Sequence, residues 1–527
     1  MDSGATATGI RFSSAAGRWI LLASILGSGL AGIDATVVNV ALPAIGADLG
    51  ADFATLQWTV TSYTLTLASF ILLGGSLGDR FGRRRIFVIG VIWFAVASLL
   101  CGIAPNAEVL IAARTLQGVG GALLTPGSLA MIQASFMPDD RARAIGAWSG
   151  LGGVATAIGP FLGGWLVQFA SWRWVFLINV PLALAVVVIS HRHVPESRGR
   201  ANSGRLDIPG AVLGAVALAG VTYALIEAPA MGLASWPVLV TAAIGIAASV
   251  AFVVVERRSR NPMLPLGIFR SAQFSATNAV TFVIYGAFGV ILFLLVVHLQ
   301  VVSGFTPIAS GTALLPVTIL MLLLSARAGA LAARIGPRIP MSVGPAICAV
   351  GLALMLRIGE DASYVFDVLP GVIVLGLGLS LLVAPLTATA LATVDDEHAG
   401  LASGVNNAVA RAAALIAIAV IPAAAGLTGE VYTNPGAFAE GFRTAVLIAV
   451  VALVAGALLA ALTIRNVNLT TDDDGGVPEG EAVPEGAAHR ARGEASLRHC
   501  AVDGPPIGTG AAHEAYAAEG GGSPRTR

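Results

Sequence analysis

The chain has 527 residues, of which 56% are hydrophobic and 11% are charged, with a mean hydropathy of +0.83 and a formal net charge of 0. About 25% of the residues of a soluble globular domain are charged, so this composition excludes an ordinary soluble domain. All 30 basic residues are arginine. A chain without lysine has neither a conventional Walker A loop nor an amine for Schiff-base chemistry.

The charge balance and the cysteines exclude further classes. Nucleic-acid-binding domains carry a basic excess, which this chain lacks, so we expect no nucleic-acid partner. Cys101, Cys348 and Cys500 are widely spaced, which fits neither a disulfide framework nor a zinc site. We therefore expect no metal, no cofactor, no use of ATP and no catalytic residues.

Fourteen apolar stretches are each long enough to cross a bilayer, which takes about 20 residues. They cover residues 19–41, 58–77, 86–104, 109–131, 144–168, 174–190, 208–226, 237–255, 275–297, 311–332, 341–358, 368–393, 402–424 and 443–464. No small-residue cleavage site follows the first stretch, so we expect a retained helix rather than a signal peptide. The sequence predicts an all-α polytopic membrane protein with 14 transmembrane helices.

The arginines test this count. If the N-terminus is cytoplasmic, eighteen arginines before the last helix fall in inside segments, whereas only Arg173, Arg357 and Arg443 fall outside. Cytoplasmic loops are enriched in Lys and Arg, and one missed helix would destroy this alternation. We therefore expect both termini to be cytoplasmic.

An internal repeat divides the helices. Residues Gly75–Arg84 and Gly329–Arg338 share the pattern G-x-L-x-x-R-x-G-x-R after helices 2 and 10. The repeat predicts a 6+2+6 plan, because two homologous bundles are common in secondary transporters. The expected parts are a cytoplasmic N-terminal segment (1–18), a six-helix bundle (19–190), a linker with two inserted helices (191–274), a second six-helix bundle (275–465) and a disordered cytoplasmic tail (466–527).

Several motifs together resemble the fourteen-helix drug/proton antiporters of the major facilitator superfamily, over roughly residues 15–465. They are D-A-T-V-V-N-V-A-L-P at Asp34–Pro43, the loop Gly75–Arg84, R-T-L-Q-G-V-G-G-A at Arg114–Ala122, G-P-F-L-G-G at Gly159–Gly164 and W-R-W-V-F-L-I-N-V-P at Trp172–Pro181. The resemblance implies proton-coupled export by alternating access, and it marks G-P-F-L-G-G as an exporter motif. Abundant Ala, Gly and Arg without lysine indicate a high-GC bacterial genome, so we expect a bacterial plasma-membrane protein.

Three charged residues lie within predicted membrane helices. A carboxylate such as Asp34 at that depth is costly and usually functional, and the resemblance implies a proton-coupling or cationic-substrate role for it. Arg114 is expected at a similar level, where it would tune a carboxylate, although a fixed structural pair is an alternative. Arg411 has no evident acidic partner in the sequence. It is expected to be either a substrate or proton-path residue or a structural clamp.

Two glycine-containing motifs are candidates for conformational control. The gating motif comprises Gly75, Asp79, Arg80, Gly82 and Arg83. The resemblance implies that Asp79 docks across the bundle interface, and we expect its target at the N-terminus of helix 13, around residues 400–404, where unpaired N–H groups attract an anion. The exporter motif supplies Gly159, Pro160, Gly163 and Gly164. For Gly159 and Pro160 the resemblance implies a hinge or seal, with tight packing as the alternative.

The leading functional hypothesis is a monomeric exporter that exchanges hydrophobic or cationic drugs or antibiotics for protons. One alternative is a proton-coupled importer of a nutrient or siderophore-like compound, which the exporter motif disfavours. Another is a polytopic membrane transferase, which would need clustered carboxylates on a membrane-facing loop. His298 is expected at the membrane interface, with a pH-sensing or substrate contact as its alternative, and Cys101 and Cys348 are expected in the core.

Overall fold

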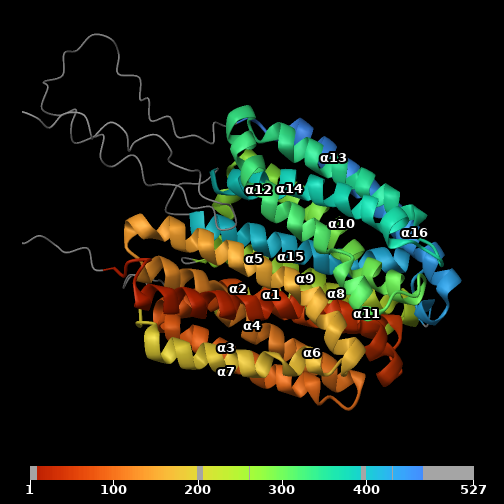
Figure 1. The fold of residues 1–527 in the computed structure, drawn as a ribbon, viewed down its shortest axis with the longest axis horizontal. Coiled ribbons are helices and arrows are strands. Elements are labelled where there is room, and N and C mark those ends of the chain that lie inside the picture. The colour runs from red at the N-terminus through yellow and green to blue at the C-terminus, as the bar shows by residue number, and fades with distance from the viewer. Residues whose placement is uncertain (1–8, 199–205, 260–261, 393–398, 430, 467–527) are drawn as a thin grey trace, which may run out of the picture.

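A computed structural model describes residues 9–198, 206–259, 262–392, 399–429 and 431–466 (Figure 1). In these ranges the chain is helical, and its only β-type pairing is an isolated bridge between Ile10 and Phe136. Fourteen spans of the described residues are long and apolar enough to cross a membrane, so the predicted all-α protein of 14 transmembrane helices is confirmed. The predicted tail after residue 466 lies outside the described residues.

Longer helices make up the spans, and short helices and turns join or extend them. In chain order the helices are α1 (Ala15–Leu49), α2 (Phe53–Phe81), α3 (Arg83–Gly102), α4 (Ala107–Ser135), α5 (Pro138–Phe169), α6 (Trp174–Leu177), α7 (Asn179–His193), α8 (Ile208–Met231), α9 (Trp236–Arg258), η1 (Leu266–Arg270), α10 (Ala272–Val301), α11 (Pro307–Thr312), α12 (Leu315–Ile335), α13 (Arg338–Leu354), η2 (Met355–Arg357), η3 (Tyr364–Val368), α14 (Leu369–Ala392), α15 (Ala399–Ala424), η5 (Val431–Thr433) and α16 (Pro435–Thr463). Helices α6 and α7 form one span, and α11 and α12 form another.

Polar caps extend several helices beyond their apolar stretches. Ser14, Asp52 and Asn106 each accept a hydrogen bond from a backbone N–H three residues later, at the starts of α1, α2 and α4, which satisfies an otherwise unpaired donor. Gly50 ends α1 with a φ of +59°, a conformation that glycine adopts without Cβ strain. Helix α1 therefore covers Ala15–Leu49 rather than only the apolar residues 19–41.

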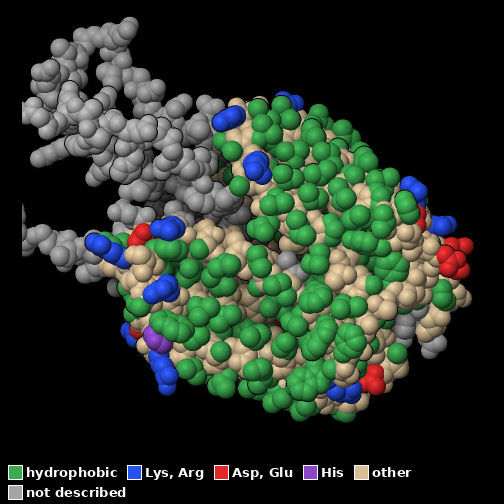
Figure 2. Space-filling model, viewed as in Figure 1, with side chains coloured by type: hydrophobic (Ala, Val, Ile, Leu, Met, Phe, Trp, Pro, Cys, Tyr) green, Lys and Arg blue, Asp and Glu red, His purple; other side chains and the backbone are tan. Residues whose placement is uncertain are grey.

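The outer surface is a broad apolar belt. Figure 2 shows hydrophobic side chains over most of the visible face, with charged side chains mainly toward its two ends. Exposed residues such as Leu462 and Trp236 belong to this belt. In a bilayer the backbone N–H and C=O groups must form hydrogen bonds within the protein, as they do in helices, so only side chains meet the lipid. The belt is therefore the surface that faces lipid.

The helices pack in two main groups and a hairpin. Helices α1 to α7 contact one another, as do α10 to α16, while α8 pairs with α9 and also contacts α2 and α15. Trp58 of α2 donates its indole N–H to Glu227 of α8 at 2.8 Å, and its ring lies 6.0 Å from that of Tyr223. The hairpin is thus held on the α2 side of the molecule.

We call the end where α1 begins and α2 finishes the arginine-rich end, because it carries Arg80 and the run Arg83–Arg85. At the opposite end the two groups are in close contact. Phe53 donates its backbone N–H to Gly429 at 2.9 Å, and its ring lies 5.9 Å from Phe293. The side-chain amide of Gln300 donates to the Val40 carbonyl at 3.0 Å. The groups are therefore joined at the opposite end.

Candidate functional site

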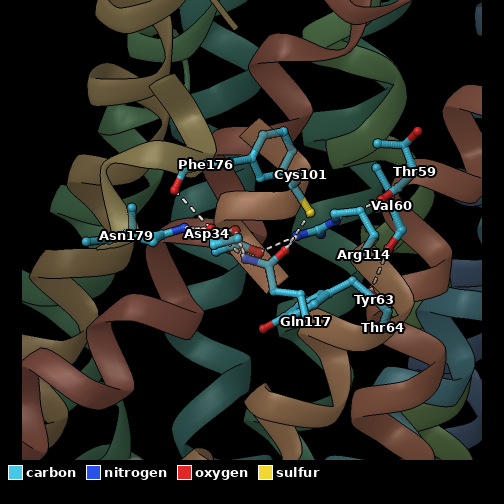
Figure 3. A network of polar contacts seen from close by, with 12 residues as sticks. Asp34, Thr59, Val60, Tyr63, Thr64, Cys101, Arg114, Gln117, Phe176 and Asn179 are labelled. Atoms are coloured by element: carbon cyan, nitrogen blue, oxygen red, sulfur yellow. Dashed lines mark hydrogen bonds and ion pairs between the residues drawn. The ribbon is translucent and has the colours of Figure 1, made fainter. Parts of the chain in front are cut away.

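Asp34 of α1 is fully buried and is held by three other side chains (Figure 3). Its Oδ2 lies 2.5 Å from Nη1 of Arg114, from α4. Its Oδ1 accepts from the Gln117 amide at 2.8 Å and from the Asn179 amide, on α7, at 3.2 Å. Both carboxylate oxygens thus have fixed partners, and three helices meet at this one group.

Arg114 is almost completely buried and makes several further interactions. Its Nε donates to the Thr59 carbonyl on α2 at 3.0 Å, and its Nη1 donates to Gln117 Oε1 at 2.7 Å. The guanidinium carbon lies 4.4 Å from the ring centre of Tyr63 and 5.7 Å from that of Phe176. A desolvated cation gains from such aromatic faces, so Arg114 is stabilised by more than Asp34 alone.

A second layer of polar groups positions the amides. Ser98 of α3 accepts from Gln117 at 3.2 Å and from Asn179 at 3.0 Å, and it donates to the Phe176 carbonyl at 2.9 Å. Cys101 lies next to Gln117, with 3.7 Å between Sγ and Oε1. The network therefore links α1, α2, α3, α4 and α7.

Tyr63 contacts this network from a helix that also lines a cavity. Its ring packs on Arg114, its side chain is buried, and its hydroxyl has no hydrogen-bond partner among the described residues. The next residue, Thr64, lines the cavity instead. Helix α2 therefore contacts both the buried ion pair and the cavity.

The cavity has a volume of about 360 Å³ and lies among α2, α10, α14 and α15. Small ligands are typically bound in cavities of about 300–1,000 Å³. Its polar lining comes from Thr64, Tyr285, Thr387, Ser403, Asn406 and Asn407, together with Arg411. Thr387 and Ser403 lie in the parts of α14 and α15 nearest the arginine-rich end. The space therefore extends from the bundle interior toward that end.

The three predicted membrane charges do not form one cluster. Asp34 and Arg114 are in direct contact, whereas Arg411 lies in the cavity wall and donates from Nε to Asn407 Oδ1 at 2.7 Å. Sequence reasoning gave no role to Gln117, Asn179, Ser98 or Tyr63. The spacing of Gln117 three residues after Arg114 places both on one helix face, and this signal was available. Ser98 and Tyr63 carry no such signal within their apolar surroundings.

The gating motif forms a local ion pair. Asp79 Oδ1 accepts from Arg83 Nε at 2.9 Å, and Arg83 also donates to the Ala130 carbonyl at 3.3 Å. The guanidinium of Arg80 lies 5.6 Å from the Phe81 ring centre, and Gly75 lies next to Pro126. The docking of Asp79 on the start of α15 stays a prediction, because the residues just before α15 lie outside the described ranges.

Gly82 joins α2 to α3 in a conformation that favours glycine, with a φ of +115°. Glu196, which follows α7, accepts from the backbone N–H groups of Arg84 at 3.1 Å and Arg85 at 3.2 Å. A carboxylate at a helix N-terminus is favoured by the unpaired N–H groups there. A Cβ on Gly82 would lie 2.7 Å from a Glu196 oxygen, so glycine is required both by φ and by space.

The exporter motif lies against two different helices. Gly163 of α5 packs against Val37 of α1, where an added Cβ would lie 3.0 Å from the Val37 carbonyl oxygen, and Gly159 packs against Thr36. Gly164 faces the start of α11, and an added Cβ would lie 2.6 Å from Cα of Ile308. Pro160 packs against Gly311 of α11 in the same region, where the two helix groups meet.

His298 lies in the last turn of α10, near the helix end where the sequence places it, and its position at the membrane interface stays a prediction. Its side chain is fully buried, and its ring stacks on Phe442 with 4.0 Å between centres. Its Nε2 lies 3.2 Å from the Ile358 carbonyl oxygen. The aromatic residues of α16 enclose a position that the sequence places only near a helix end. The predicted core placement of Cys101 and Cys348 is confirmed, because both are buried.

Comparison with known families agrees with this architecture. The family model of the Major Facilitator Superfamily matches residues 24–418. The chain belongs to this superfamily. A puromycin resistance protein of Streptomyces alboniger is 35% identical to this superfamily member over 87% of the chain and 93% of the relative. A tetracenomycin C resistance and export protein of Streptomyces glaucescens is 35% identical over 76% and 74% of the two chains.

Solved structures support the same superfamily fold. A bacterial homologue of the human lysosomal transporter Spinster, solved in an inward-facing and unoccupied conformation, aligns with a TM-score of 0.60 at 18% identity, covering 86% of this chain and 97% of the other. Members of the superfamily are transporters, so the chain is a transporter rather than an enzyme. It is a bacterial multi-pass membrane protein whose relatives confer drug and antibiotic resistance.

Proposed function

We propose that this transporter exports a hydrophobic drug or antibiotic in exchange for protons, by alternating access of a central cavity. The relatives named above support drug efflux, because they are resistance and export proteins. The observation that supports the proton step is the buried ion pair of Asp34 and Arg114. A carboxylate buried within a membrane bundle, bound to a cation that cannot deprotonate, is a site at which one proton changes the balance of charge.

Protonation of Asp34 would disrupt this pair. The carboxylate accepts from Arg114, Gln117 and Asn179, and adding a proton removes its charge and replaces an acceptor position with a donor. The three donors cannot all remain satisfied, so α1, α4 and α7 must adjust. A protonation event at Asp34 thereby favours a different packing of these helices, as required when a ligand shifts a two-state equilibrium.

The rest of the chain supplies the parts of an alternating-access cycle. In the proposed 6+2+6 arrangement the arginine-rich end is cytoplasmic, since loops there hold most of the arginines. The cavity then receives substrate from the cytoplasmic side while the contacts of Phe53, Gln300 and Gly164 close the outer side. Moving one charge across the membrane provides about 2.3 kcal/mol per 100 mV, so proton return can drive export without ATP.

Resistance of an efflux-deficient bacterial host tests this proposal. We expect the wild-type chain to raise resistance to at least one compound of a chemically varied toxic panel. Asp34→Asn removes the titratable group and keeps the shape, so it should abolish that resistance, beyond any loss that follows from a lower amount of the variant in the membrane. Asp48→Asn is the matched control, because Asp48 lies on the same helix but forms a partly exposed pair with Arg173.

Transport in vesicles gives the decisive outcome. Proteoliposomes that contain the purified wild-type protein and have an acidic interior should accumulate the identified compound, because protons leave as the compound enters. Asp34→Asn should exchange internal for external compound without accumulating it. Gradient-driven accumulation by Asp34→Asn at the wild-type rate would show that the proton is carried elsewhere.

A further inference from the structure

Two threonines in the cavity wall have already used their hydrogen-bond donors. Thr64 of α2 and Thr387 of α14 both line the cavity. The Thr64 hydroxyl donates to the Val60 carbonyl at 3.2 Å, and the Thr387 hydroxyl donates to the Val383 carbonyl at 3.1 Å. A hydroxyl has one proton and two acceptor lone pairs. Each threonine therefore donates within its own helix and keeps an oxygen that can accept.

Asn406 of α15 lines the same cavity, and α10 fixes the orientation of its amide. The Asn406 amide nitrogen donates to Asn278 Oδ1 at 3.2 Å and to Thr281 Oγ1 at 2.9 Å. The Asn278 amide itself donates to the Phe274 carbonyl at 2.9 Å, and the Thr281 hydroxyl donates to the Thr277 carbonyl at 2.9 Å. Because Asn278 and Thr281 both meet Asn406 with an oxygen, the Asn406 nitrogen must face them. Its own side-chain oxygen receives no hydrogen bond from the described residues and is left as an acceptor.

Three walls of the cavity, from α2, α14 and α15, thus supply hydrogen-bond acceptors. A ligand that enters takes the place of water at these oxygens, and a hydrocarbon or ether cannot donate the hydrogen bonds that water donates. Such a loss lowers affinity, whereas a hydroxyl or N–H group on the ligand avoids it. Asn407, the next residue of α15, differs because its Oδ1 accepts from Arg411 Nε at 2.7 Å. Its amide N–H groups can meet an acceptor that the ligand carries in addition.

We propose that the cavity selects compounds that combine an apolar body with at least two hydrogen-bond donors, hydroxyl or N–H groups. Asn406 accepts from one donor, and Thr64 or Thr387 accepts from another. The apolar body lies against aliphatic side chains that also line the cavity, namely Leu391, Ala390, Ala410 and Ala414. The inference rests on the proposed export function and narrows its hydrophobic substrates to those that carry donors.

Three probes on one ring system test this preference. 2,6-Dihydroxynaphthalene, 6-methoxy-2-naphthol and 2,6-dimethoxynaphthalene carry two, one and no hydroxyl groups. Equilibrium dialysis measures the binding of each to the purified full chain, with the same detergent in both chambers and no ion gradient. Each probe is compared with itself across variants, so its partition into detergent cancels.

The double variant Thr64→Val with Thr387→Val removes two acceptors and keeps the side-chain shapes. We expect it to bind 2,6-dihydroxynaphthalene about fivefold more weakly than the wild type does, the effect of one net hydrogen bond. 2,6-Dimethoxynaphthalene should bind with unchanged or higher affinity, and 6-methoxy-2-naphthol should fall between the two. Asn406→Leu should show the same order of effects. The threonine variant decides the outcome if Asn406→Leu, which also loses its contacts with α10, does not fold.

The matched control is the double variant Thr444→Val with Thr463→Val. Both threonines are exposed on α16, are not among the residues that line the cavity, and donate to a carbonyl four residues earlier, as Thr64 and Thr387 do. This variant should bind all three probes as the wild type does.

Unchanged binding of 2,6-dihydroxynaphthalene by the Thr64→Val, Thr387→Val variant would overturn the proposal. An equal loss for 2,6-dimethoxynaphthalene would also overturn it, as would failure of the wild type to bind the dihydroxy probe. Because no gradient is used, these results would leave the Asp34 proton step intact. Failure of the Asp34→Asn transport test would in turn leave the donor preference intact.

Discussion

The guanidinium of Arg114 lies 4.4 Å from the ring centre of Tyr63, while the next residue, Thr64, faces the cavity. One turn of α2 therefore contacts the buried ion pair on one side and the cavity on another. A movement of α2 that reshapes the cavity also shifts Tyr63 and the Thr59 carbonyl, to which Arg114 donates. In the proposed cycle, α2 would therefore link protonation of Asp34 to occupancy of the cavity.

Removing one member of the buried pair should cost more than removing both. Arg114→Leu leaves the Asp34 charge without its cation, which typically destabilises by about 3–5 kcal/mol. The double variant Asp34→Asn with Arg114→Leu should recover much of that loss, because no unpaired charge remains. Thermal unfolding of the purified proteins measures both effects, and a double variant less stable than Arg114→Leu would contradict the pairing.

Tyr63 should act through its ring rather than its hydroxyl. The hydroxyl is buried without a hydrogen-bond partner among the described residues, so Tyr63→Phe should leave the midpoint of thermal unfolding unchanged or raise it. Tyr63→Ala removes the face that stabilises Arg114 and leaves a void, which for a large aromatic residue typically costs about 3–5 kcal/mol. If Tyr63→Phe lost transport as fully as Tyr63→Ala, the hydroxyl would have a role in another conformation of the cycle.

Gly164 should be intolerant of a side chain because α5 and α11 approach each other there. Gly164→Val places atoms against Ile308 and Pro307, which would oppose closure at the end opposite the arginines. We expect the export rate to fall at least about tenfold, which corresponds to destabilising the closed state by about 1.4 kcal/mol. The protein should still reach the membrane. Gly153→Val on the same helix is the control, since nothing lies within 4 Å of its Cβ position.

Gly82→Ala should destabilise the loop between α2 and α3. The φ of +115° disfavours any side chain, and the added Cβ meets the Glu196 carboxylate that caps α3. Strained backbone conformations typically cost about 1–3 kcal/mol. Gly78→Ala, with its nearest contact at 3.9 Å, should be close to neutral. Thermal unfolding measures the stability of both variants. Equal losses of stability in the two would show that neither the φ of Gly82 nor the contact with Glu196 matters.

Much of the fold and part of the site follow from the sequence. Fourteen spans are evident because each apolar stretch is long and uninterrupted, although their ends are not, since caps such as Asp52 lie outside the apolar pattern. The contact of Asp34 with Arg114 could be anticipated because charges within apolar helices seek partners. The separation of Arg411 from that pair could not be predicted, because a helix that is apolar all round does not show which of its faces meets a cavity.

The burial of the His298 side chain could not be predicted for a similar reason. Its position near a helix end suggests contact with water, but Phe438 and Phe442 come from a helix more than 130 residues later and cover it. Ser98 and Asn179 likewise become functional candidates only when α3, α4 and α7 meet. Long-range packing supplies this information, and no local pattern contains it.

The α8–α9 hairpin makes the sides of the transporter unequal. It rests on α2 and contacts α15, the two helices that contribute Thr64 and Arg411 to the cavity. A compound dissolved in the bilayer that approaches the seam between those helices therefore meets the hairpin, held there by Trp58 and Glu227, before it meets the seam. The hairpin thus covers the seam between α2 and α15 on one side of the molecule, so in a transport cycle it would limit the directions from which lipid-dissolved molecules reach the cavity.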